Sequence, residues 1–296
     1  MNPREEGFLL LTASLGDPER KPLTIPKLRT LANRVRQQDG YDPDKATEPE
    51  DLVALGYSRQ DAEHIVALLS GKTQLLQYLR RGQQQNCHPV ARVSPEYPDL
   101  LRMRLGLNAP GCLWGKGDWQ LLDYPAVALV GSRDLRKENE ECAREVGKQA
   151  ALQNYTLISG NARGADRTAQ DSCLENGGRV ISIVADELGK YPCRENILYL
   201  SEEGFDLPFS TPRALSRNRI IHGMPTMGVF VAQCRMGIGG TWNGTIWNLQ
   251  HGHTPVFCFD DRSAVVGELT NRGAIAITKA DLQNIADLQI GRQGLF

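Results

Sequence analysis

The sequence lacks several features that would place it in a specialised class of protein. No apolar run approaches the roughly 20 residues of a membrane span, and the seven cysteines form no CxxC pair. A scattered, odd set of cysteines indicates neither a disulfide framework nor a zinc knuckle, so we expect reduced thiols, mostly in the core. The acidic start and the short apolar run at 8–11 do not fit a secretory signal, so we expect a cytoplasmic protein without a membrane partner.

An excess of charge is also missing. With 34 Lys and Arg against 35 Asp and Glu, the formal net charge is -1, which is not the basic surface typical of nucleic-acid binders. The distribution is more informative, because no carboxylate lies between Asp206 and Asp260. The same interval contains the arginines Arg213, Arg217, Arg219 and Arg235. This segment can therefore hold a positive surface within a neutral protein.

The chain divides by pattern into a helical part, residues 1–85, and a larger part, residues 86–296. Its 296 residues exceed the usual domain length of about 100–200 residues. The spacing of apolar residues predicts helices in the first part, which lie at 8–11 onward, 25–36, 52–55, 59–69 and 73–81. Short helices joined by glycine turns resemble a sterile-alpha-motif or helix-hairpin-helix module. Balanced charges and the lack of a GxG hairpin favour packing or dimerisation over DNA contact.

Strands and helices alternate in the second part. The predicted strands are 127–130, 156–158, 179–184, 197–200, 227–231 and 255–259. The predicted helices are 138–152, 165–175, 216–222 and 245–250, and 274–288 can add an edge strand and a helix. Continuously apolar strands separated by amphipathic helices are typical of a parallel sheet covered on both faces. We therefore expect an α/β fold with a Rossmann-like, doubly wound, mainly parallel sheet and a small all-helical N-terminal domain.

Small and basic residues follow several of these strands. The loops and the helix start that carry them are Gly131-Ser132-Arg133, Ser159-Gly160-Asn161-Ala162-Arg163-Gly164-Ala165-Asp166, 191–196, Ser216-Arg217-Asn218-Arg219 and Gly237-Ile238-Gly239-Gly240-Thr241. Glycine lets backbone N–H groups approach an anion, and a helix N-terminus adds about half a positive charge. Because the carboxyl ends of parallel strands share one edge, these loops predict one phosphate-binding rim.

Established cofactor motifs are missing. Neither GxGxxG with a downstream acid nor GxxxxGK[ST] occurs, so we expect no nicotinamide or nucleoside triphosphate site and no cofactor. The guanidinium groups of the arginines in these loops can instead bind phosphates with pairs of hydrogen bonds. His251 and His253 have a spacing that a metal could use, but no acidic or thiolate partner is near, so we expect no metal. Trp242 and Trp247 could stack a base, although packing is favoured for Trp247.

The sequence favours a binding protein over an enzyme. Ser132 and Ser159 have no recognisable base nearby in the sequence, and no GxSxG elbow is present. The segment richest in ligand-like loops has no carboxylate to act as acid or base. We therefore assign no catalytic residue.

The order and spacing of these motifs resemble the DprA/Smf family of bacterial DNA-processing proteins. The stretches that carry the likeness are Tyr97-Pro98-Asp99-Leu100-Leu101, 113–118, 127–133, 159–166, Tyr191-Pro192 with Glu195-Asn196, Ser201-Glu202 and 216–221. The resemblance implies an extended Rossmann-like domain that binds single-stranded DNA, forms homodimers and hands the strand to a RecA-type recombinase during transformation. It also implies that a phosphate pocket is lined by Arg133, Gly160, Arg163, Arg217, Asn218 and Arg219, and shaped by Ser159 and Asp166.

The chain departs from the family pattern at several places. Gln170 stands where typical members have a histidine, the serine-glycine-serine loop is replaced by 237–244, and no winged-helix sequence follows Phe259. DNA binding is thus better supported than recombinase loading. Gly239-Gly240-Thr241 also resembles the motif of lysine-decarboxylase-like nucleotide phosphoribohydrolases, but Asn243 replaces their catalytic glutamate. Hydrolysis of nucleoside monophosphates and sensing of a small nucleotide remain alternatives.

Overall fold

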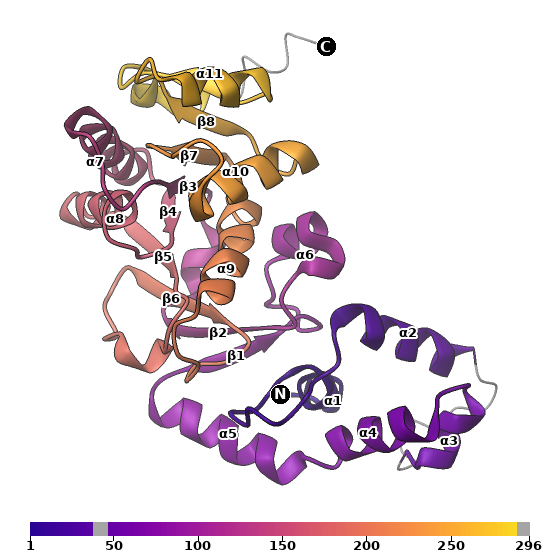
Figure 1. Ribbon diagram of the computed structural model, residues 1–296. Coiled ribbons are helices and arrows are strands. Elements are labelled where there is room, and N and C mark those ends of the chain that lie inside the picture. The colour runs from indigo at the N-terminus through magenta and orange to yellow at the C-terminus, as the bar shows by residue number, and fades with distance from the viewer. Residues whose placement is uncertain (38–46, 289–296) are drawn as a thin grey trace.

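A nine-stranded sheet occupies the larger part of the computed structural model, which describes residues 1–37 and 47–288 (Figure 1). The strand order is β1-β2-β6-β5-β4-β3-β7-β8-β9. Neighbouring strands from β6 to β9 are parallel, whereas β2 runs antiparallel to both β1 and β6. The predicted Rossmann-like, mainly parallel sheet is confirmed.

The elements of the sheet and its helices follow the predicted alternation. The strands are β1 His88–Ala91, β2 Cys112–Gly117, β3 Ala126–Val130, β4 Thr156–Ser159, β5 Arg179–Ile183, β6 Ile197–Glu202, β7 Gly228–Val231, β8 Val256–Phe259 and β9 Ile275–Ile277. The α-helices are α1 Pro3–Thr12, α2 Ile25–Arg36, α3 Pro49–Ala54, α4 Arg59–Leu69, α5 Lys72–Gln84, α6 Asp99–Leu105, α7 Lys137–Leu152, α8 Ala165–Glu175, α9 Thr211–Gly223, α10 Gly239–His251 and α11 Ala264–Asn271. Short 3-10 helices span Gly106–Asn108, Trp119–Asp123, Leu188–Lys190 and Asp281–Asn284.

Several boundaries differ from the prediction. Helix α9 begins five residues before Ser216, because the Ser210 side chain caps it by accepting from Arg213 N and Pro212 fits its first turn. Helix α10 begins at Gly239 rather than 245, and the φ of 89° at Gly239 is one that glycine adopts readily. The structure also adds β1, β2, α6 and α11, which the prediction lacked, and the helix expected within 274–288 is only a 3-10 turn.

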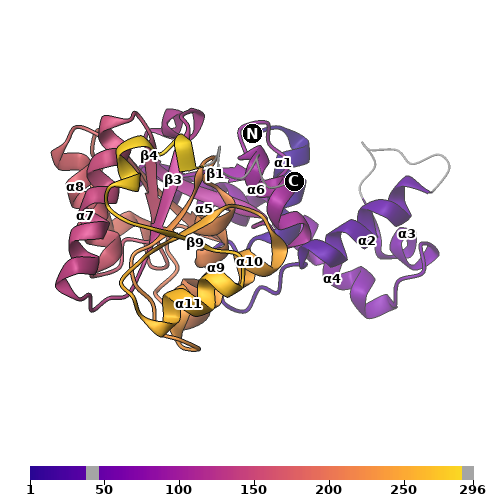
Figure 2. The same ribbon diagram turned by 90° about the horizontal axis from the view of Figure 1, so that it is seen from above.

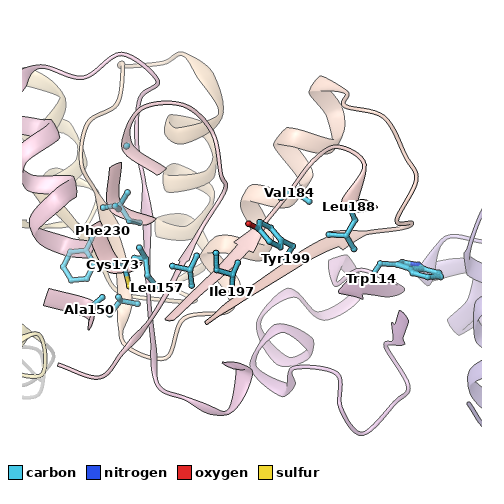
Figure 3. Packing of buried hydrophobic residues seen from close by; sticks show 14 of the residues in the cluster. Trp114, Ala150, Leu157, Cys173, Val184, Leu188, Ile197, Tyr199 and Phe230 are labelled. Carbon is cyan, nitrogen blue, oxygen red and sulfur yellow. The ribbon is translucent and has the colours of Figure 1, made fainter. Parts of the chain in front are cut away.

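Helices cover both faces of the sheet. Along β3, Val127 and Leu129 pack against α7 and α8, whereas Ala128 and Val130 pack with α6 and α9 on the other side. Successive side chains of a strand point to opposite faces, so a strand buried on both sides is apolar throughout. Figure 3 shows Leu157 among the buried side chains of the α7 and α8 face. The two hydrophobic cores hold the strand ends in fixed positions.

The N-terminal helices pack in two groups. The first, α1 and α5, joins the core of the sheet, where Tyr78 contacts Trp114 and Phe205 at ring-centroid distances of 5.1 and 4.8 Å. The Tyr78 hydroxyl donates to Asp206 Oδ1 at 2.7 Å. The second group, α2 to α4, has its own small apolar cluster and projects to one side of the sheet (Figure 2). Among the described helices, none is both long and apolar enough to cross a membrane.

The cysteines lie where the composition suggested. Six are buried and unpaired, and Cys193 is exposed. Burial raises the pKa of the Cys142 thiol to about 12 and that of Cys87 to about 11. The prediction of free thiols that lie mostly in the core is confirmed.

Candidate functional site

The candidate site lies at the switch point of the sheet, where later strands of the chain are added on opposite sides of β3. Strand β3 pairs with β4 on one side and with β7 on the other, so the loops after β3 and β7 leave in different directions. Thr241 Oγ1 on α10 donates to Gly131 O at 3.0 Å. Ser132 N donates to Gln233 O at 2.8 Å, and the Ser132 hydroxyl donates to the same oxygen. These bonds fix the N-terminus of α10 beside the first glycine loop.

Two glycines let the loops after β3 and β4 touch. A Cβ on Gly131 would lie 2.4 Å from Ala165 Cβ. Gly164 has a φ of 86°, and a Cβ there would lie 2.3 Å from Arg133 O. Ala165 N donates to Ser132 O at 3.1 Å. The structure therefore brings the two predicted loops together as one edge.

Two helices present their N-termini at this edge. Neither Gly164 before α8 nor Ile238 before α10 caps its helix with a side chain. Asp166 lies in the first turn of α8, and its Oδ2 accepts from Ala162 N at 3.2 Å. The first turn of α10 has no acidic residue, and Gly239 is exposed there. The positive end of the α10 dipole is thus open to an anion.

Arg217 lies beneath the edge rather than on it. Its side chain is 10% exposed, and Nη1 donates to Ile183 O at 2.8 Å. Nη2 lies 4.0 Å from Asp166 Oδ2. A Cβ on Gly160 would lie 1.5 Å from Arg217 Nη1, so only glycine leaves room for the guanidinium. Arg217 supports the second loop from behind.

Burial shifts the pKa values of Asp166 and Arg217. Desolvation raises the pKa of Asp166, and the Arg217 charge and the N–H groups of Ala162 and Gly160 oppose that rise. Desolvation lowers the pKa of Arg217, and Asp166 opposes that change. Ser159, the last residue of β4, is fully buried beside them. Each member of the pair stabilises the charged form of the other.

The exposed cations of the edge are other arginines. Arg133 is exposed, and Arg163 Nη2 pairs with Asp134 Oδ1 at 2.7 Å. The side chains of Arg163 and Asp134 are 77% and 68% exposed, so their ion pair is weak and can open toward a ligand.

Two further arginines extend this charge. Arg194 lies in the predicted loop 191–196, whereas Arg167 was missed by the sequence analysis. Arg167 and Arg194 are exposed. Burial raises the pKa of Tyr199, and the charges of Arg194 and Arg167 partly oppose that rise. Tyr199 stacks on Tyr191 at 4.7 Å between ring centroids. Arg167 could have been predicted as a site residue from its place in the first turn of α8, because that turn begins at the edge.

The remaining predicted residues separate on the two sides of α9. The Asn218 amide lies 2.7 Å from where a Cβ on Gly240 would stand, so Asn218 is beside the α10 N-terminus. Arg219 is exposed, with its guanidinium carbon 5.8 Å from the centroid of the Trp247 ring. Residues two apart on a helix do not share a face, so Arg219 does not join Arg217.

Gln170 and Asn243, two of the positions where the sequence departs from the family patterns, supply no ionisable group. Gln170 is buried and donates to Ser182 Oγ at 3.3 Å, so it does not reach the surface. Asn243 is exposed on α10 and supplies no carboxylate. Among the described residues, no three His, Cys, Asp or Glu side chains form a group that could hold a metal ion.

Comparison with known proteins identifies relatives of this chain. The family model described as DNA recombination-mediator protein A matches residues 88–287. DNA processing protein DprA of Streptococcus pneumoniae is 34% identical over 145 residues, which is 45% of this chain and 50% of that protein. DprA of Bacillus subtilis is 25% identical over 213 residues, or 67% of this chain and 70% of that protein. The chain thus spans about half the length of the first of these relatives.

Solved structures show the same fold. DNA processing protein A from Streptococcus pneumoniae has a TM-score of 0.60 at 24% identity, covering 88% of this chain and 97% of that one. The corresponding protein from Helicobacter pylori has a TM-score of 0.57 at 22% identity, covering 70% of this chain and 96% of that one. The family model spans well over half of the sequence and includes every loop of the candidate edge. The chain belongs to the DNA recombination-mediator protein A family.

Proposed function

We propose that this protein binds single-stranded DNA through its phosphates at the edge formed by 131–133, 160–164 and 239–241, and that it serves DNA recombination. The observation that carries the proposal is the joining of two arginine loops to an uncapped helix N-terminus. Arg133 and Arg163 are exposed there, and the first turn of α10 has no acid. The Helicobacter pylori DNA processing protein A is described as a single-stranded DNA binder, which agrees with this proposal.

The spread of charge favours a strand over a single nucleotide. The exposed arginines Arg133, Arg163, Arg167 and Arg194 come from three segments that follow β3, β4 and β5. One phosphate cannot contact all of them, whereas a strand that tracks along the edge presents several phosphates in turn. Tyr191, stacked on Tyr199, adds an aromatic ring within electrostatic reach of Arg167.

Binding is better supported than hydrolysis. The residue at the position of the hydrolase glutamate is Asn243, which cannot act as a general acid or base. Asp166, the buried carboxyl group behind the edge, is held by Ala162 N and lies beside Arg217. We therefore propose a binding protein without a catalytic residue, and no base should be released from nucleoside monophosphates.

The resemblance also supports a wider role. We propose that the protein works in the cytoplasm as a homodimer and delivers DNA to a RecA-type recombinase. Residues 86–296 would form the DNA-processing domain, while the N-terminal residues 1–85 would serve packing or dimerisation. Light scattering measures the mass in solution, and a co-precipitation with purified recombinase, with and without DNA, tests the partner.

The binding proposal is tested with a fluorescent oligothymidylate of about 20 nucleotides, above the ~4–16 that one binding module covers. Arg133→Ala and Arg163→Ala should each weaken binding about tenfold, because a hydrogen bond to a charged group contributes about 1.5–3 kcal/mol. Arg272→Gln is the matched control, since Arg272 is a surface arginine of the loop after α11, paired with Glu268. Equal affinity of all four proteins, or base release from nucleoside monophosphates, would reject the proposal.

A further inference from the structure

A second surface, away from the phosphate edge, carries an unusual group of rings. Trp247, His251 and His253 lie at the end of α10 and just after it. Their ring centroids are 4.9 Å apart for Trp247 and His251, 5.0 Å for Trp247 and His253, and 5.3 Å for the two histidines. His251 is exposed and the other two are half-buried. We call this group, with Arg219 and Arg104, the Trp247 surface.

The charges around these rings are positive. The Arg219 guanidinium lies 5.8 Å from the Trp247 ring centroid. Burial lowers the pKa of His253, and the neighbouring His251 and Arg104 lower it further. Arg104 on α6 is held in place because it donates to Gly223 O and Pro225 O, at 3.0 and 2.6 Å.

The segment that carries α9 and α10 contains no carboxylate that could neutralise the positive charges of this surface. Helices α9 and α10 lie entirely between Asp206 and Asp260, where the sequence has no acid. Glu202 lies under α9, where burial raises its pKa to about 7 against a smaller opposing effect of Arg219. Since Glu202 is only 5% exposed, it offers no competing anion at the surface.

The hydrogen bonds leave the rings available for stacking. His251 Nδ1 bonds with the Trp247 carbonyl oxygen at 2.8 Å, which fixes the imidazole against the end of the helix. The ring group therefore has a defined position before any ligand arrives. Aromatic and imidazole rings with an adjacent guanidinium are the combination on which unpaired bases stack in single-stranded nucleic-acid binders.

We propose that the Trp247 surface is a second contact site for single-stranded nucleic acid, where a base stacks on the rings and Arg219 takes a neighbouring phosphate. Helix α10 connects the two sites, since it begins at the phosphate edge and ends at His251. Its 13 residues span about 20 Å at 1.5 Å per residue. A strand that fills the edge and extends a few nucleotides beyond it reaches the Trp247 surface, so this inference rests on the proposed function of the edge.

Strand length distinguishes the two sites. An oligothymidylate of about 5 nucleotides fills the edge alone, whereas one of about 20 reaches both, given the usual ~4–16 nucleotides per binding module. The double variant His251→Ala, His253→Ala and the single variant Trp247→Leu should weaken binding of the long oligonucleotide about tenfold, because stacking contributes about 1–3 kcal/mol per base. The short oligonucleotide should bind them as it binds the unchanged protein.

Controls separate this site from the edge and from folding. Trp247→Phe retains an aromatic face and should keep most of the affinity, and His88→Ala removes an exposed histidine of β1 as the matched control. Thermal unfolding of each variant checks that the half-buried Trp247 is not needed only for packing. Arg133→Ala should weaken binding of both the short and the long oligonucleotide. If Arg133→Ala binds both normally, that result counts against the phosphate edge and not against the Trp247 surface.

Two results would overturn the inference. If the histidine and Trp247 variants fold normally and bind the long oligonucleotide as tightly as the unchanged protein, the Trp247 surface does not contact the strand. The same result is expected if this surface docks a protein instead. An equal loss for short and long oligonucleotides would also overturn it, because the surface would then act through the edge.

Discussion

Replacing Arg217 by methionine should destabilise the protein without changing any exposed side chain of the phosphate edge. The Arg217 side chain is 10% exposed, donates to Ile183 O at 2.8 Å and lies 4.0 Å from Asp166. Methionine has a similar length but neither charge nor donor. Removing one partner of a buried ion pair leaves the other charge uncompensated, which costs about 3–5 kcal/mol. We expect a loss of free energy of unfolding of that order.

The loss should depend on pH. Burial already raises the pKa of Asp166 and Arg217 opposes that rise, so Arg217→Met should raise it further. A carboxyl group whose pKa is higher in the folded state than the unfolded value of about 3.9 loses stability as pH rises above that value. The difference between Arg217→Met and the unchanged protein should therefore be smaller near pH 4 than near pH 8.

Urea unfolding of a double-mutant cycle with Asp166→Asn measures the pair. The double variant should be more stable than the sum of the two single losses predicts, because asparagine leaves no charge unpaired. Additivity within about 0.5 kcal/mol, or a loss from Arg217→Met below about 1 kcal/mol, would refute the supporting role derived from this buried pair.

Three further changes test other parts of the structure. Burial raises the Glu202 pKa from 4.5 to about 7, so the ionised carboxylate destabilises the folded protein at high pH. The stability of Glu202→Gln relative to the unchanged protein should therefore be about 3 kcal/mol greater at pH 8 than at pH 4.5. Urea unfolding at both pH values measures this difference, and an equal effect at each would contradict it. Tyr78→Phe removes the 2.7 Å bond to Asp206 and should cost about 1 kcal/mol in urea unfolding, so an unchanged midpoint would count against that contact. Gly131→Ala places a Cβ 2.4 Å from Ala165 Cβ and should destabilise the protein by about 1–3 kcal/mol while weakening oligonucleotide binding; normal affinity would show that the loops need not touch.

Local pattern was enough to predict the centre of the fold. Strand β3 is buried at every position, as its uninterrupted apolar sequence indicated. Helix α8 has the bounds that its periodicity predicted, Ala165–Glu175, and α2 and α4 likewise match. The grouping of 131–133 with the loop after β4 followed from the rule that parallel strands end at one edge.

Features that depend on tertiary contacts could not be predicted in the same way. Strand β2 lies in a segment rich in proline and glycine, and its antiparallel pairing with β6 joins residues far apart in the sequence. The burial of Arg217 depends on the space above it, because a Cβ on Gly160 would fill the position of the guanidinium. The separation of Arg217 from Arg219 was accessible to sequence reasoning, since residues two apart on a helix point in different directions.

The salt dependence of oligothymidylate binding tests the central claim most directly. Each phosphate contact to a single strand contributes about 0.7 to the negative slope of log affinity against log salt. We predict a steep negative slope for the unchanged protein and a slope shallower by about 0.7 for Arg133→Ala, with Arg272→Gln unchanged. A flat dependence, or the same slope in Arg133→Ala as in the unchanged protein, would contradict binding of DNA phosphates at this edge.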